Sequence, residues 1–171
     1  RADREAGAER SERTRLLAAR ASFALAEKQG EAYRRIRLIE PIAKTLPQKK
    51  RSLEQSLAAY DAAANYALAE VTTAATFRIA ELYGDFAKAL LESERPRGLD
   101  DEALEQYELM LEEQAYPFEE KAIEVHEANV RRAARGVYDD WVKKSYAALA
   151  RLLPARYGKS ERSGGPADAL Q

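Results

Sequence analysis

Hydrophobic residues recur along this chain at the three- and four-residue spacing of α-helices, and no segment of useful length alternates as a β-strand would. Turn and breaker residues divide this pattern into about six predicted helices. The predicted helices cover residues 9–29, 31–47, 48–70, 72–93, 100–135 and 138–153. We therefore expect an all-α fold built from antiparallel helical hairpins that stack against one another.

Proline and glycine set the expected breaks. Gly30 is a natural end for the first helix, and Pro41 should kink the second. Pro117 should kink or split the fifth helix, which would otherwise be a rod of roughly 50 Å. Gly136 should end it. Kinks are therefore expected near residues 41 and 117.

The stretch between Pro47 and Pro96 is rich in alanine and holds a single glycine, Gly84. Small side chains let two long helices approach closely, and a close crossing would offset the roughly 1 kcal/mol that glycine costs inside a helix relative to alanine. Residues 1–158 should form one domain, and residues 159–171, with their Ser-Gly-Gly-Pro run, a disordered tail. The first residue, Arg1, suggests a fragment of a longer chain.

Charge is strongly segregated although the net charge of the 171 residues is only −1. Residues 1–51 carry 14 Lys/Arg against 7 Asp/Glu, residues 52–130 carry 5 against 18, and residues 131–171 carry 9 against 4. Two interpretations stay open. The blocks pack side by side and neutralise one another, or the acidic middle and the basic ends meet partners of opposite charge. No apolar run reaches the ~18–20 residues of a membrane-spanning helix.

Residues that carry chemistry are scarce. The chain has no cysteine, and the positions three and four residues from its one histidine, His126, hold no metal-binding side chain. Glycine-rich phosphate loops and nucleophile motifs are also missing from the sequence. The arginines near the amino terminus are interleaved with glutamate and lack stacking aromatics, which argues against nucleic acid. We predict a protein that is not an enzyme, with no catalytic residue, cofactor or metal.

A small-x-x-x-aromatic-x-x-small pattern occurs twice, 43 residues apart. Its members are Ala19, Phe23 and Ala26, and then Ala62, Tyr66 and Ala69. A further step of twice 43 residues reaches Ala148, Leu152 and Ala155. The pattern resembles the second helix of tetratricopeptide repeats, whose usual period is about 34 residues. The resemblance implies a degenerate, elongated tetratricopeptide-like repeat.

Residues 67–91, 105–120 and 138–157 are similar to the carboxyl-terminal region of large proteobacterial tetratricopeptide-repeat proteins. Those proteins resemble components of envelope machines, among them Tol/Exb-type energy-transducing systems and gliding-type motility. The similarity covers roughly residues 15–158 and implies a periplasmic or envelope-associated scaffold. The absence of cysteine suits the periplasm and the cytoplasm equally.

We hypothesise that the chain is a module that binds other proteins. Polar side chains of the predicted fourth helix and the acidic fifth helix would select the partner. The candidate partner-binding residues are Arg78, Glu81, Asp85, Glu112, Glu113 and Tyr116. Tyr116 either belongs to a bend that recognises a basic segment or lies in the core together with Phe118 of a kinked helix. The alternative hypothesis is an oligomerising or capping helical bundle, in which residues 100–135 form the interface of a homo-oligomer.

Overall fold

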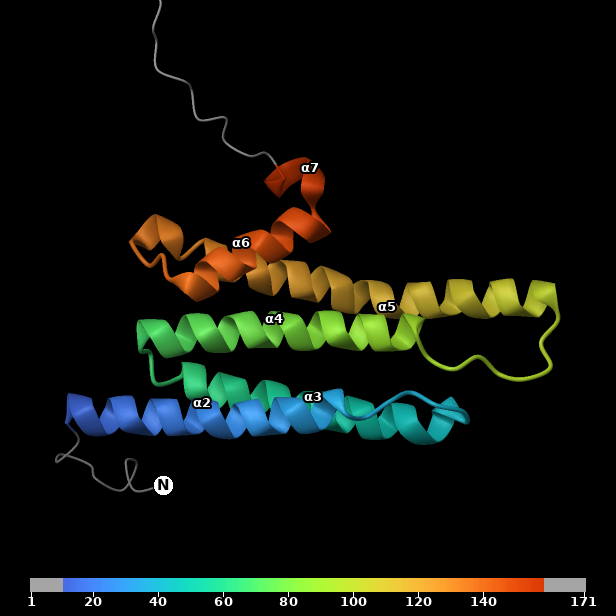
Figure 1. The fold of residues 1–171 in the computed structure, drawn as a ribbon, viewed down its shortest axis with the longest axis horizontal. Coiled ribbons are helices and arrows are strands. Elements are labelled where there is room, and N and C mark those ends of the chain that lie inside the picture. Colours follow the sequence, from blue (N-terminus) through green and yellow to red (C-terminus); the bar gives the residue numbers. More distant parts are fainter. Residues whose placement is uncertain (1–10, 159–171) are drawn as a thin grey trace, which may run out of the picture.

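The computed structural model describes residues 11–158, and every regular element in that range is helical (Figure 1). The fold is all-α, as the hydrophobic pattern predicts. Its elements are α2 (Glu12–Arg34), α3 (Ile42–Ala64), α4 (Ala69–Leu91), α5 (Asp101–Val130), the short 3-10 helix η2 (Ala133–Arg135), α6 (Asp140–Leu152) and α7 (Pro154–Tyr157). The predicted tail and the predicted helix start at residue 9 lie outside the described residues.

The long helices lie side by side as antiparallel neighbours (Figure 1). α2 and α3 form one hairpin, α4 runs along it, and α5 returns along the opposite side of α4. α6 packs obliquely across the carboxyl-terminal half of α5 and also touches α4. The amino-terminal end of α5 projects beyond the end of α4. This arrangement agrees with the predicted stack of hairpins.

α4 is the central element of the core, since α2, α3, α5 and α6 all contact it. Its buried positions include Leu82, Phe86 and Leu90, which pack with Tyr33 of α2 and Tyr60 of α3. Small residues on the same helix allow close packing, because Ala75 and Ala80 are completely buried. At Gly84 a Cβ atom would lie 4.0 Å from the Cβ of Ala122 on α5, so the predicted close crossing is present.

The predicted break at Gly30 is wrong. α2 runs through Gly30 to Arg34, because this glycine packs against the ring of Tyr60. The predicted second helix over residues 31–47 does not form, and residues 35–41 connect α2 to α3. Pro41 follows a cis peptide bond and is the N-cap of α3, so it precedes a helix rather than kinking one.

α3 includes Pro47, where the sequence predicts a boundary. A proline costs a helix one backbone hydrogen bond, and burial of Leu53 and Tyr60 on the same helix offsets it. α3 ends at Ala64, and residues 65–68, not 70–72, connect it to α4. Within residues 65–68, Ala67 has a positive φ of 54°.

α5 begins as the sequence predicts, with the carboxylate of Asp100 accepting a hydrogen bond from the backbone N–H of Ala103. Pro117 does not split the helix, which stays continuous to Val130. Its end comes five residues before the predicted one, and Gly136 closes the following η2 with a φ of +82°. The described range holds six α-helices, the number predicted. The two sets differ, because no separate helix forms at residues 31–47 and the short α7 is not predicted from the sequence.

The small-aromatic-small pattern does not lie on a single helix at each occurrence. Ala19, Phe23 and Ala26 share one face of α2, and the two alanines are fully buried. The second occurrence, at residues 62–69, crosses the connection between α3 and α4. The third, at residues 148–155, crosses from α6 to α7.

Candidate functional site

A half-buried network of ion pairs joins α2 to α4. The guanidinium of Arg78 donates to Glu27 at 2.9 Å and to Glu81 at 2.7 Å. One turn along α4, Asp85 accepts from Arg34 of α2 at 2.8 Å, and Arg34 also lies 3.8 Å from Glu81. The structure therefore brings Arg78, Glu81 and Asp85 together, and it turns all three toward α2.

Burial and charge act in opposite directions on the arginines of this network. Burial alone lowers the pKa of Arg78, but the hydrogen bond with Glu81 and the charge of Glu27 outweigh it and raise that pKa. The pKa of Arg34 is raised in the same way by Asp85. Both arginines therefore stay charged, and the network fixes α2 against α4. Along this line Arg34 of the basic block pairs with Asp85 of the acidic block, whereas the Arg78–Glu27 pair joins a basic residue of the acidic block to an acidic residue of the basic block.

Glu112, Glu113 and Tyr116 lie elsewhere, on the solvent-exposed side of α5. With their neighbours they form a surface that we call the α5 outer face. Its members are Glu105, Leu109, Glu112, Glu113, Tyr116 and Glu120, and all six are exposed. Leu109 and Tyr116 stand two helical turns apart with 54% and 58% of their surface exposed. The phenol of Tyr116 donates to Glu120 at 2.8 Å.

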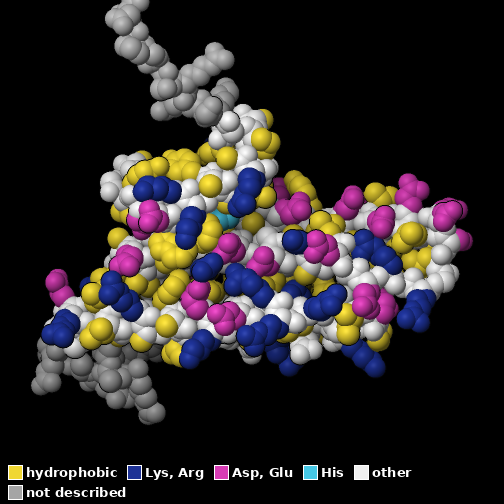
Figure 2. Space-filling model, in the orientation of Figure 1, with side chains coloured by type: hydrophobic (Ala, Val, Ile, Leu, Met, Phe, Trp, Pro, Cys, Tyr) yellow, Lys and Arg dark blue, Asp and Glu magenta, His cyan; other side chains and the backbone are white. Residues whose placement is uncertain are grey.

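Acidic side chains dominate α5. Residues 101–130 carry ten Asp and Glu against one lysine, Lys121, which pairs with Glu124 at 2.6 Å. Among the described residues, Glu105, Glu112 and Glu113 form no ion pair with a basic side chain. Figure 2 shows acidic side chains along α5, including its projecting end, and basic ones along the α2–α3 edge. The carboxylates of Glu105, Glu112 and Glu113 thus face solvent.

Tyr116 is exposed, whereas Phe118, two residues later, packs against Phe86 of α4 with ring centroids 4.5 Å apart. The prediction that both aromatics lie in the core is therefore wrong for Tyr116. Phe118 is partly buried and does pack against the core. Pro117 lies on the exposed side as well, where water can satisfy the backbone carbonyl of Glu113 that loses its helical donor.

A buried polar cluster ties α5 to α4 and α6. The amide of Asn129 donates to the carbonyl of Thr73 at 3.1 Å and to the hydroxyl of Ser145 at 2.9 Å. The same hydroxyl lies 3.3 Å from Nδ1 of His126, which is 4% exposed. Burial lowers the pKa of His126 to about 4, with a smaller effect from Arg151. His126 is therefore a neutral, hydrogen-bonded packing residue.

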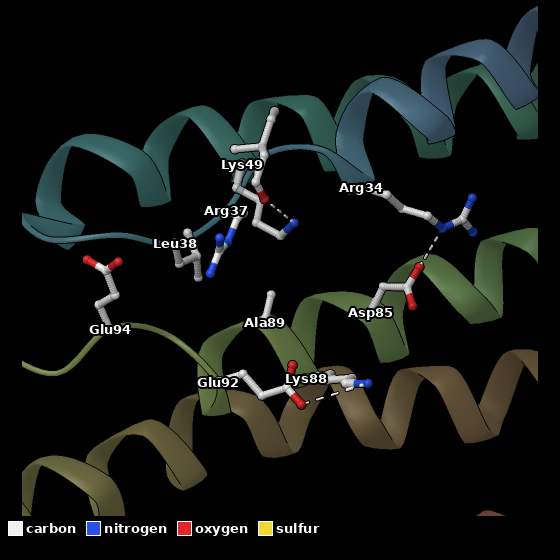
Figure 3. Close-up of a pocket in the computed structure, with 10 residues that line it drawn as sticks. Arg34, Arg37, Leu38, Lys49, Asp85, Lys88, Ala89, Glu92 and Glu94 are labelled. Carbon is white, nitrogen blue, oxygen red and sulfur yellow. Dashed lines mark hydrogen bonds and ion pairs between the residues drawn. The ribbon is translucent and has the colours of Figure 1, made fainter.

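A pocket of about 340 Å³ opens between the residues 35–41 connection, α3 and α4 (Figure 3). Lys49 of α3 lines it, although this lysine is only 3% exposed. Arg37 from the connection also lines it. Neither residue is predicted from the sequence, because Lys49 becomes buried only when residues 35–41 fold back over α3. The sequence feature that points to this pocket is the density of basic residues in the segment 31–51.

In the part of the chain that the structure describes, no group of three or more His, Asp or Glu side chains is placed to hold a metal ion. None of the described helices combines the length and the apolar character needed to cross a membrane. The chain matches no protein-family model, no curated protein and no solved structure.

Proposed function

We propose that this chain is a non-enzymatic protein-interaction module whose α5 outer face binds a basic, partly apolar segment of another protein. The observation that carries the proposal is the pairing of two exposed apolar side chains, Leu109 and Tyr116, with unpaired carboxylates on the same helix face. Such apolar anchors two turns apart suit a partner helix, and the carboxylates suit lysine or arginine around its apolar side chains.

Charge favours a different protein over a second α5 as the occupant. Two copies meeting through this face would bring the carboxylates of Glu112 and Glu113 against each other, and close like charges repel. A basic partner meets the opposite sign, which speeds encounter and fixes the orientation of the complex. The α2–α4 network does not compete for such a partner, because Arg78, Glu81 and Asp85 already pair with α2.

The remainder of the scaffold supports this role by holding α5 in place. Leu111, Ala115 and Ala122 are buried on its inner side, so the outer face is presented on a rigid helix. We also propose that the module works in the bacterial envelope as part of a tetratricopeptide-like assembly. That step rests on the resemblance of residues 67–91, 105–120 and 138–157 alone.

The test uses residues 1–171 as bait in a cross-linked pull-down from a proteobacterial envelope extract at low and high salt. A discrete protein should be retained at low salt and lost at high salt. The double variant Glu112→Lys/Glu113→Lys should lose it while its thermal unfolding midpoint stays within a few degrees of wild type, since both side chains are exposed.

The matched control is Glu31→Lys/Glu54→Lys, which makes the same change in net charge at two exposed positions of α2 and α3. This control should retain the partner. Equal loss of binding in both variants would show that only overall charge matters, and loss of stability together with binding would assign Glu112 and Glu113 a structural role.

Light scattering separates the proposal from the oligomerising bundle. Exposure of Leu109, Met110 and Tyr116 is the observation that favours this alternative. A monomer at all concentrations would exclude it, whereas a dimer abolished by Leu109→Ser would establish it and displace the proposal.

A further inference from the structure

The pocket beside Lys49 holds an uneven set of charges. Four cationic side chains line it, Arg34, Arg37, Lys49 and Lys88. Two of them have carboxylate partners inside the same pocket, since Arg34 pairs with Asp85 at 2.8 Å and Lys88 with Glu92 at 3.8 Å. Lys49 and Arg37 form no ion pair with a described residue, and the lining as a whole carries four cations against three carboxylates, those of Asp85, Glu92 and Glu94.

Lys49 is the buried member of this pair. Its ammonium donates to the backbone carbonyl of Ile36 at 2.7 Å and lies 3.5 Å from that of Tyr33. It also stands 4.3 Å above the ring of Tyr33. An ammonium has three donors, and these contacts use two of them. Burial disfavours this charge, and the carboxylate of Asp85, which favours it, is hydrogen-bonded to Arg34, so an anion in the pocket would stabilise it further.

Arg37 is the exposed member. It projects from the residues 35–41 connection toward the same space as Lys49 (Figure 3). No hydrogen bond or ion pair holds its guanidinium among the described residues, which leaves its whole donor fork available. A guanidinium fork matches the geometry of a phosphate or carboxylate group, and a lysine adds a compact point charge.

The carboxylates at the pocket do not block such a ligand. Asp85 and Glu92 are engaged by Arg34 and Lys88, and Glu94 accepts the backbone N–H of Glu40 at 2.9 Å. The surrounding segment is basic, because residues 31–51 carry seven Lys and Arg against two Glu. Its field therefore attracts anions toward the opening.

We propose that this pocket is a binding site for the oxyanion group of a small ligand, a phosphate ester or a carboxylate. Lys49 contacts the group from the floor of the pocket, and Arg37 closes over it from the rim. The volume of about 340 Å³ accommodates a ligand of the size of a sugar phosphate. The site is separate from the α5 outer face and does not depend on the function proposed for that face.

Isothermal titration calorimetry of the full chain tests the site, with methyl phosphate and acetate as separate probes at pH 7 and constant ionic strength. Saturable binding of methyl phosphate alone assigns a phosphate site, and of acetate alone a carboxylate site. Arg37→Gln should weaken the bound probe about tenfold, as expected for loss of a charge-assisted contact. Arg35→Gln, an exposed neighbour outside the pocket, should change the affinity less than twofold.

Lys49→Met keeps the apolar stem and removes the charge, and it should abolish binding if the variant folds by circular dichroism. If it does not fold, the comparison of Arg37→Gln with Arg35→Gln still decides. No saturable binding of either probe would overturn the proposal. Equal weakening by both arginine variants would also overturn it, because binding would then follow the diffuse basic charge of residues 31–51 and not the pocket.

Discussion

The phenol oxygen of Tyr60 lies 2.9 Å from the position that a Cβ atom on residue 30 would occupy, so Gly30 makes room for a buried hydroxyl. That hydroxyl donates to Glu27 at 2.5 Å, and Glu27 in turn accepts from Arg78. A glycine near the carboxyl-terminal end of α2 is therefore linked through Tyr60 of α3 to the ion pairs on α4. Burial, followed by the hydrogen bond to Glu27, raises the pKa of Tyr60, which keeps the phenol protonated as the donor.

Gly30→Ala should destabilise the protein although alanine is the better helix former. The new methyl group displaces the phenol of Tyr60 and strains its bond to Glu27, at a cost of roughly 1–3 kcal/mol, which exceeds the ~1 kcal/mol gained in helix propensity. In a Tyr60→Phe background the nearest remaining ring atoms are 3.5 and 3.6 Å away, an ordinary contact. In that background, Gly30→Ala should raise the free energy of unfolding by about 1 kcal/mol.

Urea denaturation of wild type, Gly30→Ala, Tyr60→Phe and the double variant measures the effect of Gly30→Ala on stability with and without the hydroxyl. Ala32→Gly, at an exposed position of the same helix, gives the propensity difference without any contact and should cost about 1 kcal/mol. A stabilising Gly30→Ala in the wild-type background would contradict the steric argument. So would an equal effect of this substitution with and without the hydroxyl.

Gly30 also shows where sequence reasoning stops. A glycine followed by a new apolar stripe predicts a helix end, and only the position of Tyr60, 30 residues later, shows why α2 continues. In the same way, Pro41 predicts a kink, because the sequence does not reveal that residues 35–41 pack over Lys49. Local pattern is enough for the all-α class, the hairpins and the Asp100 cap, since periodicity and capping are local properties.

Of the candidate partner-binding residues, some are predictable from local sequence and others depend on tertiary packing. Exposure of Glu112 and Glu113 follows from the acidic pattern of one helix, which sequence displays directly. The ion pair of Arg78 with Glu27, two residues 51 positions apart in the chain, is set by the packing of α4 against α2, and no local pattern encodes it. Charge blocks indicate that pairing is available, but they do not say which arginine meets which carboxylate.

The Glu27–Arg78 pair should contribute measurably to stability. Both side chains are less than one third exposed, at 30% and 25%, so screening by solvent is incomplete. A double-mutant cycle of Glu27→Gln and Arg78→Gln should give a coupling free energy of roughly 1–2 kcal/mol that shrinks in 1 M salt. The exposed Arg20–Glu70 pair, at 56% and 67%, is the control and should couple by less than ~0.5 kcal/mol. Equal coupling for the two pairs would rule out an effect of burial.

His126 should make the protein less stable in acid. Its pKa is lowered to about 4 in the folded chain, and that of an unfolded histidine is about 6.5. The unfolded state therefore binds a proton between these values that the folded state does not. The stabilisation from neutral His126 is complete above about pH 6.5 and is lost progressively as the pH falls toward 4, by at most ~3 kcal/mol.

His126→Gln removes this titration and leaves the carboxylates unchanged. The difference in unfolding free energy between wild type and variant should shrink between pH 7 and pH 4, as measured by urea denaturation at several pH values. A direct titration of the imidazole by NMR is the second measurement. A folded-state pKa at or above 6 would contradict the burial argument for this residue.

Ala67→Gly should stabilise the protein, because Ala67 holds a φ of +54° in the connection between α3 and α4. A side chain with a Cβ pays roughly 1 kcal/mol for this left-handed conformation, whereas glycine adopts it freely. Part of that gain is lost to the greater freedom of glycine in the unfolded chain, so the expected net effect is about 0.5–1 kcal/mol. Ala58→Gly, at an exposed position inside α3, should instead destabilise by about 1 kcal/mol. Thermal or urea denaturation of the two variants therefore gives shifts of opposite sign. Destabilisation by both would mean that the connection at residues 65–68 does not hold Ala67 in the left-handed region.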